Sequence, residues 1–220
     1  MRVKLVMART SDKLDLADCE LTDVPDDVWQ LDNLEDLSLA GNHLTHLPAG
    51  LGQLTNLQRL VVAGNWLEQL PAAIGALTAL EGLWAHGNQI CSIPETLGCL
   101  SSLRTLSLSG NCISVMPQSM VSLSAVTDLQ LAGNRLTELP TSLARMTALQ
   151  KVTLHGNRLT TLPEGLGSLP SLRVRRCVAY GWVPFSQVSS HAGLRAQAMS
   201  AGYDSACTQA CRWCTQWEMT

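Results

Sequence analysis

Apolar residues recur along most of the chain with one spacing. From Leu34 the order of apolar and polar positions repeats every 23 residues, with the shared form LxxLxLxxNxLxxLPxxLxxLxx. The six copies that match it begin at Leu34, Leu57, Leu80, Leu103, Val126 and Leu149. A weaker seventh copy precedes them and begins at Ser11. A fixed period of this length indicates a chain built from stacked structural repeats.

Each copy predicts the same two short elements. The LxL segment alternates with period two, which predicts a short strand with one buried face. The apolar residues that follow are spaced three or four apart, as at Leu47, Leu51 and Leu54, which predicts a short helical turn. One copy alone could not bury its leucines, so neighbouring copies must stack. Each turn begins at a proline, which has no N–H and so loses nothing at a position where the N–H would have no acceptor. These prolines are Pro48, Pro71, Pro94, Pro117, Pro140 and Pro163.

These residues resemble the leucine-rich repeat family in its 23-residue, proline-containing form, as found in intracellular Ras-suppressor-like and scaffold proteins. The resemblance covers residues 11–172. It implies an α/β solenoid, a right-handed coil with a parallel β-sheet on its concave face and short helical or 3-10 turns on its convex face.

The repeat pattern divides the chain into three parts. Residues 1–10 are expected to form half a repeat or an N-terminal cap. Seven repeats then occupy residues 11–172, with starts at 11, 34, 57, 80, 103, 126 and 149. Residues 173–220 form an atypical tail, in which leucine almost disappears and four of the eight cysteines occur. This tail could fold back as a cap helix, be disordered, or be foreign to the family.

An asparagine recurs at the ninth position of the repeats. Its amide has two donors and an acceptor, which is enough to hold the backbone of its own loop and of the adjacent loop. We therefore assign these residues a structural role, with Cys19 at the same position of the first copy. The predicted asparagine ladder consists of Asn42, Asn65, Asn88, Asn111, Asn134 and Asn157.

The variable strand positions predict a partner-binding surface on the concave face. Trp84 and His86 project side by side from the middle strand, and Gly82 leaves space beside the indole. An exposed aromatic side chain among small or polar neighbours is typical of a binding hot spot. The alternative is that Trp84 turns inward, because Ala85 stands where the pattern wants leucine. The predicted contact residues are Arg59, Val61, Trp66, Trp84, His86, Ser107, Ser109, Gln130 and His155.

Composition and charge narrow the class of partner. The net charge is −3, and it is unevenly distributed. Residues 1–36 contain four basic and ten acidic side chains, a balance of −6, whereas residues 101–176 contain eight basic and three acidic side chains, a balance of +5. No basic stripe is dense enough to predict nucleic-acid binding. We find no apolar run long enough for a membrane helix or a signal peptide. Single, scattered cysteines favour a reducing compartment, so we expect a cytoplasmic location. We also expect the protein to be a monomer.

Candidate metal and catalytic residues were considered and not assigned. His86 and His155 lie three strands apart, about 14 Å, which is too far to share a metal ion. The C-terminal triplet Cys207, Cys211 and Cys214 resembles the cluster-binding motif of radical SAM enzymes, but no barrel follows it. A zinc site formed by this triplet with His191 lacks the paired CxxC spacing of a strong zinc motif. A redox pair within the CRWC segment lacks the βαβ fold in which such pairs occur. We therefore predict no catalytic residue, no metal and no cofactor.

The combined prediction is a non-catalytic protein–protein interaction module, acting as an intracellular signalling scaffold or adaptor whose concave face binds a partner protein. Neither nucleic acid nor membrane is expected as a partner. The alternative is a recognition fragment of a larger leucine-rich repeat enzyme, a kinase, phosphatase or GTPase, whose catalytic domain is absent from this chain.

Overall fold

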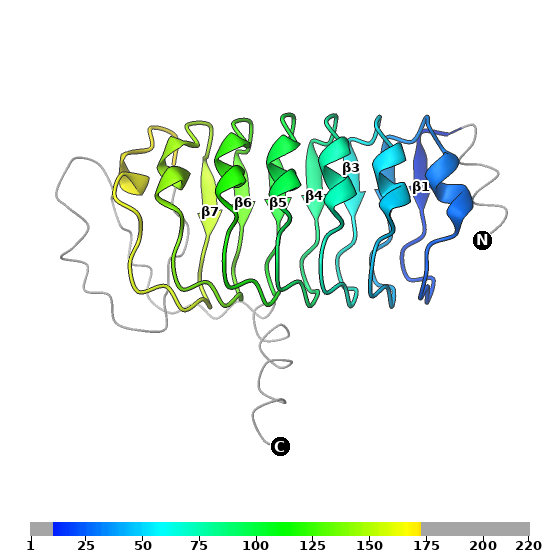
Figure 1. The fold of residues 1–220 in the computed structure, drawn as a ribbon, viewed down its shortest axis with the longest axis horizontal. Helices are drawn as coiled ribbons and strands as arrows, with labels where there is room; N and C mark the ends of the chain where they lie inside the picture. The colour runs from blue at the N-terminus through cyan, green and yellow to red at the C-terminus, as the bar shows by residue number, and fades with distance from the viewer. Residues whose placement is uncertain (1–10, 173–220) are drawn as a thin grey trace, which may run out of the picture. The chain divides into compact units, whose positions relative to one another are not determined.

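A computed structural model describes residues 11–172, in which three-residue strands alternate with short 3-10 helices. Figure 1 shows the strands side by side on one side of this segment and the helices on the other. The strands are β1 (Lys13–Asp15), β2 (Asp36–Ser38), β3 (Arg59–Val61), β4 (Gly82–Trp84), β5 (Thr105–Ser107), β6 (Asp128–Gln130) and β7 (Lys151–Thr153). The helices are η1 (Asp26–Gln30), η2 (Ala49–Gln53), η3 (Ala72–Ala76), η4 (Glu95–Cys99), η5 (Gln118–Ser122), η6 (Thr141–Arg145) and η7 (Leu166–Ser168).

All seven strands form one parallel sheet in chain order. The register follows the sequence period, so that Lys13 pairs with Asp36 and Asp36 with Arg59. The middle residue of every strand is buried, as Leu37 and Leu60 are. This parallel sheet with 3-10 turns confirms the predicted fold class. The expected cap in 1–10 and the tail in 173–220, including the cysteine triplet, lie outside the described residues.

A proline begins the first six helices and sets their form. Pro48, for example, is the N-cap of η2, and its carbonyl accepts a hydrogen bond from Leu51 N at 3.1 Å. Proline fixes φ near −65° and has no N–H, so it suits the start of a turn that closes over three residues. The last helix, η7, is shorter and follows Gly165, although Leu166 N still bonds to Pro163 O at 3.2 Å.

One aliphatic cluster runs through all the repeats between the strands and the helices. Most of its leucines are completely inaccessible to solvent, as expected for copies that bury their apolar faces against each other. The cluster also contains one aromatic residue, Trp29 in η1, which the aliphatic composition did not lead us to expect. Gly50 leaves room for it, because a Cβ there would lie 2.9 Å from the indole Cγ and Cδ1.

The asparagine amides connect each repeat to the one before it. Asn65 Nδ2 donates to Val62 O of its own repeat at 3.1 Å and to Leu39 O of the preceding repeat at 2.9 Å. Its Oδ1 accepts from Leu44 N at 3.1 Å. The same set of bonds recurs with a shift of 23 residues up to Asn157. In the first repeat, where Cys19 replaces asparagine, Asn42 Oδ1 accepts from both Cys19 N and Leu21 N.

We predict that Asn111→Ala lowers the free energy of unfolding by about 1–3 kcal/mol, because it leaves buried backbone groups without partners. The groups affected are Ala85 O, Leu108 O and Ile90 N, each bonded to the Asn111 amide at 2.9–3.0 Å. Denaturant unfolding measures the loss. The matched control is Asn56→Ala, since Asn56 is exposed and bonds only to Asp32 O. Equal losses in the two variants would contradict a special contribution of the ladder.

Candidate functional site

Trp84 lies on the sheet face and not in the hydrophobic core. It is half-buried, whereas its neighbours Leu83 and Ala85 are completely buried. The indole lies over Gly82 of its own strand, where an added Cβ would overlap the ring atoms Cη2 and Cζ3. Ala85 thus fills its core position without drawing the indole inward, and the glycine provides the space that the ring occupies.

Arg59 of β3 covers the same indole. Its guanidinium carbon lies 4.9 Å from the Trp84 ring centroid, within the range of a cation–π contact. Asp36 of β2 holds the guanidinium from the other side, with Arg59 Nε 3.4 Å from Asp36 Oδ2. Register explains the arrangement, because Arg59 pairs with Gly82 and Val61 pairs with Trp84. We call Asp36, Arg59, Val61, Gly82 and Trp84 the tryptophan cluster.

A chain of polar side chains continues across the sheet from His86, just after β4, to Lys151 in β7. Lys151 Nζ donates to Asp128 Oδ2 at 2.9 Å, and Gln130 Nε2 donates to the same oxygen at 3.1 Å. Ser107 Oγ donates to Gln130 Oε1 at 3.0 Å and lies 3.3 Å from Nδ1 of His86. We call these residues the polar chain.

Asp128 sets the direction of every hydrogen bond in the polar chain. An ionised carboxylate only accepts, so the Gln130 amide nitrogen must face it and the amide oxygen must face Ser107. The single hydroxyl proton of Ser107 goes to that oxygen. His86 Nδ1 must then carry a proton and donate to Ser107 Oγ, which leaves Nε2 of the neutral ring as an acceptor. Burial also lowers the pKa of His86, which favours this neutral form.

The structure divides the predicted contact residues into groups. Arg59, Val61 and Trp84 belong to the tryptophan cluster, and His86 and Gln130 belong to the polar chain. Ser107 is also in the chain but is only 1 % exposed, so it supports its neighbours and offers a partner almost no surface.

The other three predicted residues lie outside both groups. Trp66 follows β3 at the rim, is 51 % exposed and makes an edge contact with His43 at 4.8 Å between ring centroids. Ser109 and His155 are half-buried and lie shortly after the ends of β5 and β7, respectively. Because β7 is three strands from β4, His155 and Trp84 do not form one contact point.

Sequence analysis missed the charged residues that support both groups. Asp36 precedes Arg59 by 23 residues, and Asp128 precedes Lys151 by the same interval. Side chains one period apart lie side by side in the sheet, so two opposite charges at this spacing predict an ion pair. This signal was present in the printed sequence.

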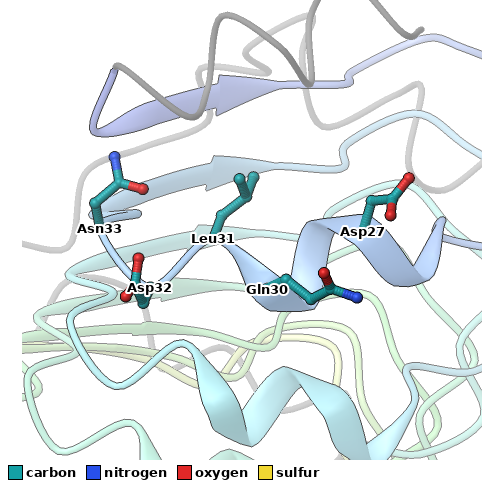
Figure 2. A pocket seen from close by; sticks show the side chains of 5 residues that line it. All are labelled: Asp27, Gln30, Leu31, Asp32 and Asn33. Atoms are coloured by element: carbon teal, nitrogen blue, oxygen red, sulfur yellow. The ribbon is translucent and has the colours of Figure 1, made fainter.

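A second surface feature lies at the N-terminal end of the described segment. Figure 2 shows the side chains of Asp27, Gln30, Leu31, Asp32 and Asn33, which line a hollow beside η1. The hollow has a volume of about 330 Å³. Leu31 is its one apolar lining residue. Within residues 11–172, no group of three or more His, Cys, Asp or Glu side chains is placed to hold a metal ion. The hollow therefore carries no assignment. Among residues 11–172, no helix is both long enough and apolar enough to cross a membrane.

Two family models match the sequence. The model of a leucine-rich repeat region matches residues 13–109, and a leucine rich repeat model matches residues 86–136. Together with the fold, these matches establish that the chain belongs to the leucine-rich repeat family. Domains of this family generally mediate protein–protein interaction and are typically non-catalytic. Comparison of the sequence with curated proteins gave no significant match.

Solved structures of the same fold come from bacteria and plants. A leucine-rich repeat protein of Leptospira interrogans is 26% identical over 80% of this chain and 56% of its own, with a TM-score of 0.59. The ectodomain of the Arabidopsis thaliana membrane receptor kinase GASSHO1/SCHENGEN3, in complex with CASPARIAN STRIP INTEGRITY FACTOR 2, is 32% identical with a TM-score of 0.65. It matches over 69% of this chain and 19% of its own.

An internalin of Listeria monocytogenes, 22% identical with a TM-score of 0.59, shares the fold over 75% of this chain and 52% of its own. The chain thus spans about half the length of the two bacterial proteins and about a fifth of the plant ectodomain.

We predict that Gly82→Ala displaces the Trp84 indole, because the new Cβ would overlap the ring. The indole N–H signal of Trp84 in a nitrogen–proton NMR spectrum should shift, once it has been assigned by its disappearance in Trp84→Phe. Thr105→Ala is the control, since it changes the register partner of Gly82 on β5 and adds no Cβ at residue 82 itself. An unshifted signal in Gly82→Ala would show that the indole does not lie over residue 82.

We predict that His86 makes stability fall as the pH drops. Burial lowers its pKa below the ordinary value of 6.5, so the unfolded chain binds the proton more readily than the folded chain. The stability that neutral His86 contributes is therefore fully present above pH 6.5. It decreases as the pH falls through 6.5 towards the pKa of His86 in the folded chain. Unfolding measured at about pH 7 and about pH 5 should show a larger loss in the native protein than in His86→Gln. Equal losses would contradict this role of His86.

Proposed function

We propose that this chain is a non-catalytic protein-binding module whose sheet face contacts a partner protein around Trp84. The observation that carries the proposal is that Gly82 and Arg59 hold the indole on the outer side of the sheet. Large aromatic side chains of this kind dominate the binding energy of many interfaces. An indole that is already held in place loses little conformational freedom on binding, and this favours affinity.

The polar chain supports a contact surface that is wider than one tryptophan. Six strands from β2 to β7 span about 24 Å at a spacing of about 4.8 Å, which suits a helix or a small lobe of a partner. The tryptophan cluster offers apolar and cationic surface at one end. His86 offers an uncharged acceptor next to it, and Lys151 offers a paired ammonium group at the other end. A partner segment with an apolar anchor and polar flanks would match this order.

The plant receptor ectodomain adds support from a different source. It is similar to this chain in sequence and fold, and it was solved in complex with a second component, CASPARIAN STRIP INTEGRITY FACTOR 2. Repeats of this type therefore serve for binding in that protein. We extend only the general role, recognition of a partner, to the present chain.

We further propose that the module acts in the cytoplasm as a monomeric signalling scaffold or adaptor. The support is the state of the cysteines in residues 11–172, since Cys91, Cys99 and Cys112 are free thiols. Thiols of this kind persist in a reducing compartment. Fractionation of cells that express the tagged protein tests the location, and an extracellular protein would contradict it.

We predict that Trp84→Ala weakens partner binding at least tenfold without unfolding the protein, because it removes a surface anchor and no core side chain. Partners are first recovered by affinity capture on the immobilised native chain, and each Kd is then measured with purified components. The matched control is Val115→Ala, which shortens an apolar side chain that is 64% exposed and lies outside the strands.

The two variants separate the possible outcomes. Loss of binding in Trp84→Ala with an unchanged melting temperature, and normal binding in Val115→Ala, supports the sheet face. If both variants bind as tightly as the native chain, the sheet-face proposal is wrong. A large fall in the melting temperature of Trp84→Ala would instead show that the indole serves mainly to stabilise the fold.

A further inference from the structure

Two cysteines face each other across adjacent repeats. Cys112 N donates to Ile90 O at 2.9 Å. In the sheet the equivalent bond, from Asp36 N to Asp12 O, accompanies the register pair of Asp36 with residue 13. By the same geometry Cys112 lies beside Cys91. The Cys112 thiol is also near enough to Cys91 to raise the pKa of the Cys91 thiol.

This juxtaposition belongs to a column that runs along the repeats. At each junction the tenth residue of one repeat lies beside the twelfth residue of the repeat before it, through the same amide-to-carbonyl bond. Only one junction in the described segment brings two thiols together. The other five pairs are Thr22–His43, Thr45–Trp66, Glu68–Gln89, Ser114–Arg135 and Thr137–Arg158.

The spacing of the column suits a covalent bond between the sulfurs. Neighbouring backbones joined by such hydrogen bonds lie about 4.8 Å apart, and disulfides join Cα atoms that are about 4.4–6.8 Å apart. Cys91 is exposed and Cys112 is half-buried, so a small oxidant can reach the pair from solvent. Little backbone movement is then needed to close the bond.

We propose that Cys91 and Cys112 are a site of reversible oxidation, at which a small-molecule disulfide such as oxidised glutathione converts the two thiols into a disulfide between the fourth and fifth repeats. The thiolate of one cysteine attacks a sulfur of glutathione disulfide, forms a mixed disulfide and releases one glutathione thiol. The second cysteine attacks the mixed disulfide and releases the other glutathione. The protein loses two electrons and two protons, and the glutathione disulfide gains them.

The surroundings of the pair indicate how fast it reacts. Partial desolvation raises the pKa of the exposed Cys91 thiol, and the neighbouring Cys112 raises it further, as does Glu68 to a smaller extent. Arg135 acts in the opposite direction without reversing the shift. The thiolate is the reactive form, so the pair reacts slowly near neutral pH and faster as the pH rises.

The bond would join the two repeats that carry Trp84, His86 and Ser107. It lies in the loops after β4 and β5, outside both the tryptophan cluster and the polar chain. Oxidation is therefore separable from partner binding, and the existence of the site does not depend on the proposed function. A failure of either proposal leaves the other intact.

The test equilibrates the full-length protein with glutathione buffers from reducing to oxidising ratios. Remaining thiols are blocked with N-ethylmaleimide, and linked peptides are identified by mass spectrometry. We expect a Cys91–Cys112 linkage that disappears on return to reducing buffer, while Cys99 stays alkylated. Between about pH 7 and about pH 8 the rate of linkage should rise about tenfold, as expected for thiols well below their pKa.

Two controls separate the folded geometry from chance pairing. Cys91→Ser should leave Cys112 without an internal partner, so that it carries either glutathione or the alkylating group. Oxidation of the native chain in concentrated urea should give mixed pairings, because the fold no longer holds the two cysteines together. The proposal is overturned if both cysteines of the folded protein remain alkylated at the most oxidising ratio and higher pH. Preferential linkage of either to another cysteine would overturn it equally.

Discussion

The amide of the ninth-position asparagine is the interaction on which the rest of the structure depends. After each of the strands β2 to β7 the backbone turns through a glycine with φ between +63° and +68°, and after β1 it turns through Asp18 with a φ of +52°. At these turns, carbonyls of two adjacent repeats face inward without strand partners. The asparagine donates to both and accepts from an amide of the preceding repeat. A buried polar group without a partner costs more than most single contacts contribute, so every repeat must adopt the same turn. Identical turns keep the register at one period from β1 to β7.

A constant register makes the surface a set of columns. Side chains that are 23 residues apart lie side by side, whatever their local sequence. The pairs Asp36–Arg59 and Asp128–Lys151 are products of this rule. Cys91 and Cys112 are 21 residues apart, and the same constant register brings them together because the tenth residue of one repeat lies beside the twelfth residue of the repeat before it. The chemistry of the sheet face therefore depends on which residues share a repeat position, and a residue's neighbours along the chain matter less than its neighbours one period away.

The columns also explain how the chain can hold an aromatic side chain in one place on the sheet face. Gly82 removes the Cβ that would obstruct the indole, and Arg59 covers part of the ring with a charged group that stays in contact with water. The side chain is thus partly sheltered and confined to one place. A contact residue that is already confined loses little conformational entropy when a partner buries it, so more of the free energy of burial contributes to affinity.

The periodic pattern by itself determined the strands, their parallel order, the aliphatic core and the positions of the asparagines, because each depends on spacing that every repeat encodes locally. The ion pairs could also have been found from that spacing. The direction of the Trp84 indole, the burial of Ser107 and the inclusion of Trp29 in the core were decided only by the tertiary structure. These depend on how side chains of different repeats share a limited space: the gap over Gly82, the reach of Gln130 and His86 towards one hydroxyl, and the room beside Gly50. Periodicity places a residue in a column, but the volumes and hydrogen-bonding groups of its neighbours decide which way the side chain turns.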